Sequence, residues 1–122
     1  MTTTEIATRL VQLCRKGDWA QAQQELYEDS AESIEPAGAP WGNVQGKAAI
    51  QQKAAQWFSS VEEFHGSEIS DPLVAGDFFT IRMMNDTTMK GMGRMQFEEI
   101  CLYQVRDGKI IKEQFFYIPM MP

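Results

Sequence analysis

The first third of the chain has apolar residues at helical spacing. Thr2 and Glu5 have the spacing of a capping box, and Gly17 can end the helix that they begin. The apolar side of this first helix is formed by Ile6, Leu10 and Leu13. Asp18 can cap a second helix. Its apolar side is formed by Trp19, Ala22 and Leu26. Two short amphipathic helices in succession predict a helical hairpin.

A strand, a loop and a third helix are expected next. Residues 33–36 read as a short strand that Pro36 ends, and the glycine and proline content of residues 37–43 indicates a loop. From Gly46 onward the apolar residues return to helical spacing. The stripe that should face the core is Ile50, Ala54, Trp57, Phe58 and Val61.

The second half of the chain reads as strands separated by turns. Strands are predicted over residues 63–70, 78–87, 94–105 and 109–118. Asp107-Gly108 is a strong hairpin signal between the last two. Helices followed by an antiparallel meander predict an α+β fold, with the helices on one face of a curved sheet.

The composition fits one folded domain over residues 1–122, with 43% hydrophobic residues. There is no apolar block for a signal peptide and no run near the ~20 residues of a membrane span, so we expect a cytoplasmic protein without a membrane partner. The formal net charge of −6 argues against a nucleic-acid partner. Cys14 and Cys101 lack CxxC spacing, so they indicate neither a disulfide nor a metal site and are expected to be buried.

Three segments resemble landmarks of SnoaL-like domains in the nuclear transport factor 2-like superfamily. They are residues 26–36, 46–50 and 105–110, and their order and spacing extend the resemblance over nearly the whole chain. The resemblance implies a cone in which three N-terminal helices pack on a curved antiparallel or mixed sheet that encloses a pocket. The superfamily includes ketosteroid isomerases, polyketide cyclases, epoxide hydrolases, dehydratases and non-catalytic modules, so the fold alone does not decide the function.

Glu35 stands where the resemblance implies the carboxylate base of ketosteroid isomerases, directly before Pro36. A carboxylate there could move a proton next to a carbonyl group. The alternative is a solvated glutamate at the end of a strand. The isomerase donor positions fall on Leu10 and near Ala54, which carry no hydroxyl group, so the usual steroid isomerisation is not expected.

Alternation along the strands predicts which side chains face the pocket. On the strand 78–87, alignment with the family turn predicts an inward set of Arg82, Met84 and Asp86. On the last strand the predicted inward set is Glu113, Phe115 and Tyr117. The first prediction leaves Phe79, Ile81 and Met83 on the outer face. Because exposed apolar residues there would need a cover, we expect a homodimer.

The strand 94–105 has two possible registers. One face carries Glu99, Cys101, Tyr103 and Val105. A slip of one residue would turn Glu98 toward the pocket instead of Glu99. Trp41, from the loop, and Trp57, from the third helix, complete the expected pocket lining.

The predicted pocket therefore holds one arginine among four acids: Arg82, Glu35, Asp86, Glu99 and Glu113. Such a set either forms a structural network or raises the pKa of an acid by crowding like charges. We favour the network for Arg82 and Asp86, and proton transfer for Glu35 and Glu99. His65 is a third candidate for proton transfer, or else a hydrogen-bonded packing residue; a lone histidine does not support a metal site.

Two functions from different classes fit these residues. The first is a cofactor-free isomerase, cyclase or hydratase in which Glu35 moves a proton and Glu99 or His65 completes the pair. The second is a non-catalytic module for small-molecule binding or dimerisation, with the same pocket but no proton transfer. In both cases the expected ligand is a small, largely apolar organic molecule with a polar handle.

Overall fold

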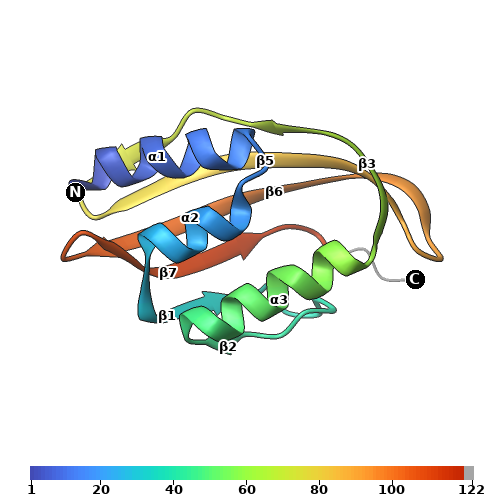
Figure 1. Ribbon diagram of the computed structural model, residues 1–122, viewed down its shortest axis with the longest axis horizontal. Coiled ribbons are helices and arrows are strands. Elements are labelled where there is room, and N and C mark those ends of the chain that lie inside the picture. Colours follow the sequence, from blue (N-terminus) through green and yellow to red (C-terminus); the bar gives the residue numbers. More distant parts are fainter. Residues whose placement is uncertain (120–122) are drawn as a thin grey trace.

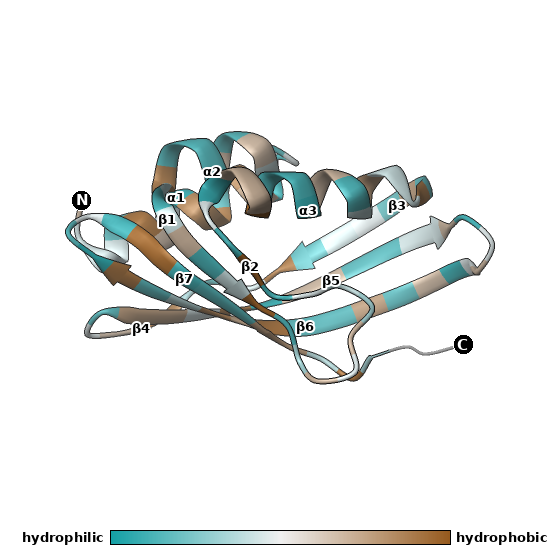
Figure 2. Ribbon diagram, turned by 90° about the horizontal axis from the view of Figure 1, so that it is seen from below, coloured by the Kyte–Doolittle hydropathy of each residue, from teal (hydrophilic) through white to brown (hydrophobic). Residues whose placement is uncertain are grey.

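The chain folds into three helices that cover one face of a seven-stranded sheet. A computed structural model describes residues 1–119. The helices are α1 (Thr3–Arg15), α2 (Trp19–Leu26) and α3 (Lys47–Ser59). The strands are β1 (Tyr27–Ile34), β2 (Val44–Gln45), β3 (Val61–Ile69), β4 (Leu73–Ala75), β5 (Phe78–Met89), β6 (Gly93–Arg106) and β7 (Lys109–Phe116). Figure 1 shows the helices lying across the sheet, and Figure 2 shows the sheet curving beneath them. The predicted α+β cone is confirmed.

The helices begin and end where local chemistry favours it. The capping box of α1 forms, because the Glu5 backbone N–H donates to Thr2 Oγ1 (3.1 Å) and the Thr2 N–H donates to Glu5 Oε1 (2.8 Å). Gly17 follows α1 with a φ of +80°, which an L side chain rarely adopts. After α2 the backbone becomes extended at Tyr27. The strand predicted over residues 33–36 overlaps the longer β1 only at residues 33 and 34, because β1 ends at Ile34.

The strand order is β2-β1-β7-β6-β5-β3, with β4 paired to β5. Only β1 and β7 are parallel among the strand pairs of residues 1–119; the other pairs are antiparallel. The predicted hairpin between β6 and β7 turns at Asp107 (φ +51°) and Gly108 (φ +75°). Such a turn matches the twist of the strands that it joins.

The side of β5 that faces the helices is the opposite of the predicted one. Phe79, Ile81 and Met83 are buried against the helices, each at most 2% exposed. Arg82, Met84 and Asp86 lie on the outer face, so their predicted place in the pocket is wrong. The physical reason is that the apolar set of β5 completes the core beneath the helices, whereas its charged set reaches solvent.

The outer face of the sheet carries ion pairs and a few apolar side chains. Arg82 lies 2.7 Å from Glu98 and 3.5 Å from Glu68, and Asp86 lies 3.0 Å from Arg94. The exposed apolar residues of this face include Phe78, Ile100, Phe116 and, on β4, Leu73, whereas the predicted Phe79 and Ile81 are buried.

The core lies between α1, α2 and the inner face of β5 and β6. Phe79 stacks on Tyr103 with ring centroids 4.8 Å apart, and Ile6 and Leu10 of α1 are buried in the same cluster. Cys14 and Cys101 are buried free thiols, as predicted. None of the helices in residues 1–119 is long and apolar enough to cross a membrane.

Candidate functional site

A pocket of about 140 Å³ lies between the helices and the inner face of the sheet and opens to solvent. Its walls are largely aromatic, with contributions from Trp19, Trp41, Trp57, Phe58, Phe97 and Phe115. Trp57 packs edge-on against Phe58 (5.0 Å between ring centroids), and Phe97 packs against Tyr117 (4.9 Å). Such walls favour flat, apolar ligands.

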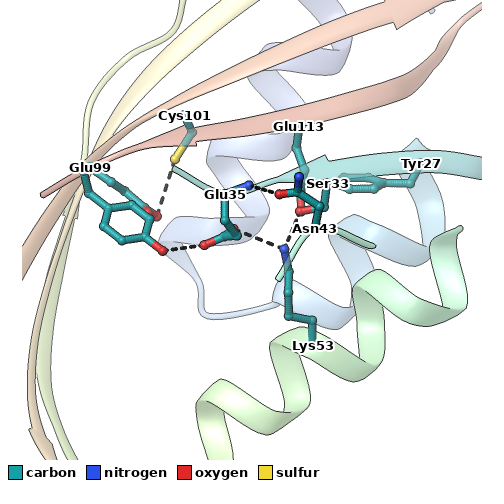
Figure 3. Close-up of polar contacts among 9 residues, drawn as sticks. Tyr27, Ser33, Glu35, Asn43, Lys53, Glu99, Cys101 and Glu113 are labelled. Carbon is teal, nitrogen blue, oxygen red and sulfur yellow. Dashed lines mark hydrogen bonds and ion pairs between the residues drawn. The ribbon is translucent and has the colours of Figure 1, made fainter. Parts of the chain in front are cut away.

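Glu35 lies in this pocket directly after the end of β1. Its Oε1 accepts a hydrogen bond from the Tyr117 hydroxyl (2.5 Å), and its Oε2 is 3.1 Å from the ammonium of Lys53. The Glu35 backbone N–H donates to Asn43 Oδ1 (2.7 Å), which fixes the chain where the strand ends. Figure 3 shows Lys53 reaching Glu35 from α3. With 7% of its side chain exposed, Glu35 is a paired carboxylate and not a solvated one.

Lys53 connects Glu35 to a second buried acid. Its ammonium donates to Ser33 Oγ (2.6 Å), and the Ser33 hydroxyl donates to Glu113 Oε2 (2.6 Å). The Tyr27 hydroxyl donates to the other oxygen of Glu113. Burial raises the pKa of Glu113, although the bonds from Ser33 and Tyr27 oppose this shift. Glu113 is therefore a structural acid beneath the pocket, with both oxygens satisfied.

Glu99 has a different environment on β6. It is largely buried, and its nearest donor is the weak Cys101 thiol, with Sγ 3.6 Å from Glu99 Oε1. Burial raises the pKa of Glu99 to about 8, the thiol bond lowers it, and the charges of Glu35 and Glu113 raise it. At neutral pH the larger fraction of Glu99 is protonated, and its carboxyl group can donate a hydrogen bond into the pocket.

The structure brings together most of the predicted site residues. The predicted residues that line the pocket are Glu35, Trp41, Trp57, Glu99, Tyr103, Glu113, Phe115 and Tyr117. Cys101 lies behind Glu99 on the same face of β6. This arrangement confirms the register that turns Glu99 inward and Glu98 outward.

His65 does not belong to this group. It lies on β3, with Nε2 2.7 Å from Thr88 Oγ1 and 3.5 Å from Glu63, and it is not part of the pocket wall. Its predicted place as the partner of Glu35 in proton transfer is therefore wrong. The hydrogen bond to Thr88 agrees with the alternative, a packing residue on the sheet.

Sequence reasoning missed several polar residues of the site, and local patterns could have indicated three of them. Lys53 follows Ile50 by three positions and precedes Trp57 by four, so it lies on the apolar stripe where a lysine needs a partner. Ser33 lies two residues before Glu35 on the same strand face. Asn85 was missed because the prediction exchanged the inward and outward faces of β5. Helical spacing and strand alternation could have found all three.

The sequence and the fold match known proteins. A family model described as the SnoaL-like domain matches residues 1–117. The chain belongs to this SnoaL-like family. A structure from Mesorhizobium loti, named as a candidate SnoaL-like polyketide cyclase, is 38% identical and has a TM-score of 0.88, over 96% of this chain and all (100%) of that one. A search of proteins with curated functions found no match.

Solved structures with lower sequence identity share the fold. A nuclear transport factor 2-like protein from Burkholderia thailandensis is 20% identical with a TM-score of 0.80, over 97% of this chain and 92% of that chain. TerC, co-crystallised with polyporic acid, is 16% identical with a TM-score of 0.75, over 95% of this chain and 91% of that chain.

The polar groups of this SnoaL-like pocket can support acid–base chemistry. A paired carboxylate, Glu35, and a carboxylic acid, Glu99, face one apolar cavity. Leu10 and Ala54 also line the pocket, and neither side chain can donate a hydrogen bond. Within residues 1–119 no group of three His, Cys, Asp or Glu side chains could hold a metal ion.

Proposed function

We propose that this SnoaL-like domain binds a small, largely apolar carbonyl compound and moves a proton next to the carbonyl group, as an isomerase, cyclase or hydratase does. The observation that carries the proposal is the pairing of Glu35 and Glu99 in one pocket. Glu35 is ion-paired with Lys53, whereas burial raises the pKa of Glu99 to about 8. Acid and base roles are thus set apart by environment, as in other carboxyl pairs.

The roles follow from these environments. Glu35 takes a proton from the carbon next to the carbonyl group, and the electrons of that C–H bond move to the carbonyl oxygen. Protonated Glu99 donates to that oxygen as negative charge develops on it. Return of the proton from Glu35 to another carbon completes an isomerisation. Tyr117 and Lys53 hold the Glu35 carboxylate in place throughout.

Exchange of carbon-bound protons tests the proposal directly. 1-Tetralone is dissolved in D₂O with the protein at neutral pH, and loss of the proton signal next to its carbonyl group is followed by NMR. Wild-type protein should accelerate the exchange. Glu35→Gln should lower the rate about 10²-fold or more, because the base is lost. Glu99→Leu should lower it too, because the donor is lost.

Glu98→Gln is the matched control. Glu98 neighbours Glu99 on β6 but is ion-paired with Arg82 on the outer face, so its loss should leave the exchange rate unchanged. Equal exchange rates in wild-type protein, Glu35→Gln and Glu99→Leu would refute the acid–base roles.

A non-catalytic binding or dimerising module is the second candidate. It is favoured by one observation: both oxygens of Glu35 already accept hydrogen bonds, from Tyr117 and Lys53. For such a module Glu35→Gln leaves the affinity for ligand nearly intact, and no variant changes a proton-exchange rate because the wild type accelerates none.

We also propose that the chain forms a homodimer through the outer face of its sheet. The proposal is supported by the apolar side chains Phe78, Ile100 and Phe116, which are between 44% and 48% exposed on that face. Ile100 and Phe116 are direct cross-strand partners, so they form one continuous patch.

A further inference from the structure

One buried polar group in the pocket has no partner in the protein. Asn85 of β5 is 5% exposed and lines the pocket, and its Oδ1 accepts no hydrogen bond from any group in residues 1–119. Burial of an unpaired amide oxygen is unfavourable, and folded proteins rarely leave one. Asn85 is therefore a vacant acceptor that a ligand can fill.

Two buried carboxyl groups of the pocket differ from the Asn85 amide in this respect. Glu35 and Glu113 each accept hydrogen bonds at both oxygens from groups of the protein. Met83, two residues away on the same face of β5, and Phe97, the cross-strand partner on β6, are apolar. Ser67, the cross-strand partner on β3, and Thr87 of β5 carry hydroxyl groups, but neither donates to Asn85 Oδ1.

The register of β5 and β6 relates Asn85 to Glu99. Met83 pairs with Glu99 and Asn85 pairs with Phe97, so Asn85 and Glu99 occupy diagonal positions on the inner face. Diagonal neighbours across antiparallel strands are roughly 7–8 Å apart. A ligand whose carbonyl oxygen meets Glu99 therefore has its opposite end near Asn85.

We propose that Asn85 determines specificity by accepting a hydrogen bond from a hydroxyl or amino group of the substrate. The substrate class is then a ring ketone that carries a donor at the end far from its carbonyl group. The position of the carbonyl end rests on the proposed function, whereas the donor at Asn85 rests on the vacant acceptor. A pocket of about 140 Å³ encloses about one six-membered ring, and it is open to solvent.

Four probes of one skeleton test the proposal by binding. They are 1-tetralone and its derivatives with hydroxyl, amino or methyl at ring position 6, where the methyl group matches the donors in size but cannot donate. All three tryptophans of the chain, Trp19, Trp41 and Trp57, line the pocket, so tryptophan fluorescence reports its occupancy. Wild-type protein should bind the hydroxyl or the amino derivative about tenfold more tightly than the methyl derivative. Comparison of the hydroxyl derivative with the amino derivative shows which donor the pocket prefers.

Asn85→Leu should reduce this preference to less than about twofold, since leucine is similar in size and accepts no hydrogen bond. Asn85→Ala is measured alongside, so that a packing defect of leucine does not decide the result. Met83→Leu, two residues away on the same face, should keep the preference because Asn85 remains. A wild-type protein without the preference, or variants that retain it, would overturn the proposal.

Stability without ligand separates a binding role from a structural one. Asn85→Leu removes an unpaired acceptor, so its folding equilibrium constant in urea titrations should equal or exceed that of wild type. A loss of more than about tenfold in both Asn85 variants would assign the side chain a structural role and overturn the proposal. Proton exchange of 1-tetralone distinguishes the two proposals. Accelerated exchange without tighter binding of the donor-bearing derivatives refutes only the role of Asn85. Tighter binding of those derivatives without accelerated exchange refutes only the acid–base function.

Discussion

Glu35 and Glu99 illustrate how neighbours set the state of the same chemical group. The oxygens of Glu35 meet an ammonium and a phenol, whereas those of Glu99 meet a thiol and apolar walls. The second environment favours the neutral form of Glu99. An acid and a base can therefore coexist in one small pocket at neutral pH.

The proton on Glu99 should make stability depend on pH. Because the folded pKa of about 8 exceeds the model value of 4.5, the folded state holds a proton that the unfolded state releases between these values. Stability should therefore fall as pH rises through this window, by on the order of 4 kcal/mol for Glu99. Urea unfolding from pH 4.5 to 8.5 should show this slope in wild-type protein and a smaller one in Glu99→Gln. Equal slopes would contradict the raised pKa of Glu99.

Removal of Lys53 should leave a buried carboxylate without its cation. The side chains of Lys53 and Glu35 are only 13% and 7% exposed, so Lys53→Met should destabilise the fold by about 3–5 kcal/mol. Lys47→Met on the same helix is the control: Lys47 pairs with Asp29, which is 99% exposed, and should lose less than about 1 kcal/mol. Urea titrations measure both. The double variant Lys53→Met/Glu35→Leu lacks both members of the ion pair. If it is no more stable than Lys53→Met, an unpaired Glu35 carboxylate does not cause the destabilisation.

Single residues were predicted well where one physical signal acted alone. Alternation turned Tyr117 toward the pocket, whereas on β6 it left two registers, of which the preferred one turned Glu99 inward. Arg82 and Asp86 were misplaced because an alignment with the family turn overruled the alternation of apolar and charged residues on β5. The raised pKa of Glu99 depends on side chains that converge from distant segments, which no local pattern encodes.

Elements were predictable where their periodicity was strong. The three helices and the long strands β3, β5, β6 and β7 appear near their predicted bounds. Most of β1 was missed because its polar residues 28–30 show no alternating pattern, and its pairing with β7 decides its conformation. β2 and β4 are too short to leave a periodic signal.

The hairpin between β6 and β7 should depend on Gly108. Its φ of +75° is unfavourable for an L side chain, and a Cβ there would lie 3.4 Å from the Met1 nitrogen. Gly108→Ala should therefore lower the free energy of unfolding by roughly 1–2 kcal/mol. Gly42→Ala has ordinary backbone geometry and open space, so it should change stability by less than about 1 kcal/mol in either direction. Thermal unfolding compares the Gly108→Ala and Gly42→Ala variants. Equal losses of stability would contradict a special requirement for glycine in the β6–β7 turn.

At the scale of the whole molecule, the two faces of the sheet serve different purposes. The inner face is apolar beneath the helices and carries the acids of the pocket. The outer face mixes ion pairs with Ile100 and Phe116. A mixed face of this kind suits an interface between protein surfaces better than a second core.

A charge at the centre of the outer patch should break the proposed dimer. Ile100→Glu places a carboxylate beside Phe116, so light scattering during gel filtration should show a dimer for wild type and a monomer for the variant. Met92→Glu, in the turn between β5 and β6, should remain dimeric because it lies outside the patch. A monomeric wild type would refute the proposed dimer.

The parallel pairing of β1 with β7 also affects how the protein is made. On the ribosome, the segment of Tyr27 and Ser33 emerges long before its strand partner, and Glu113, which both hydroxyls bind, is synthesised about 80 residues later. Closing so long a loop is slow. The buried hydrogen bonds of Tyr27 and Ser33 can therefore form only after the strand that carries Glu113 has been translated.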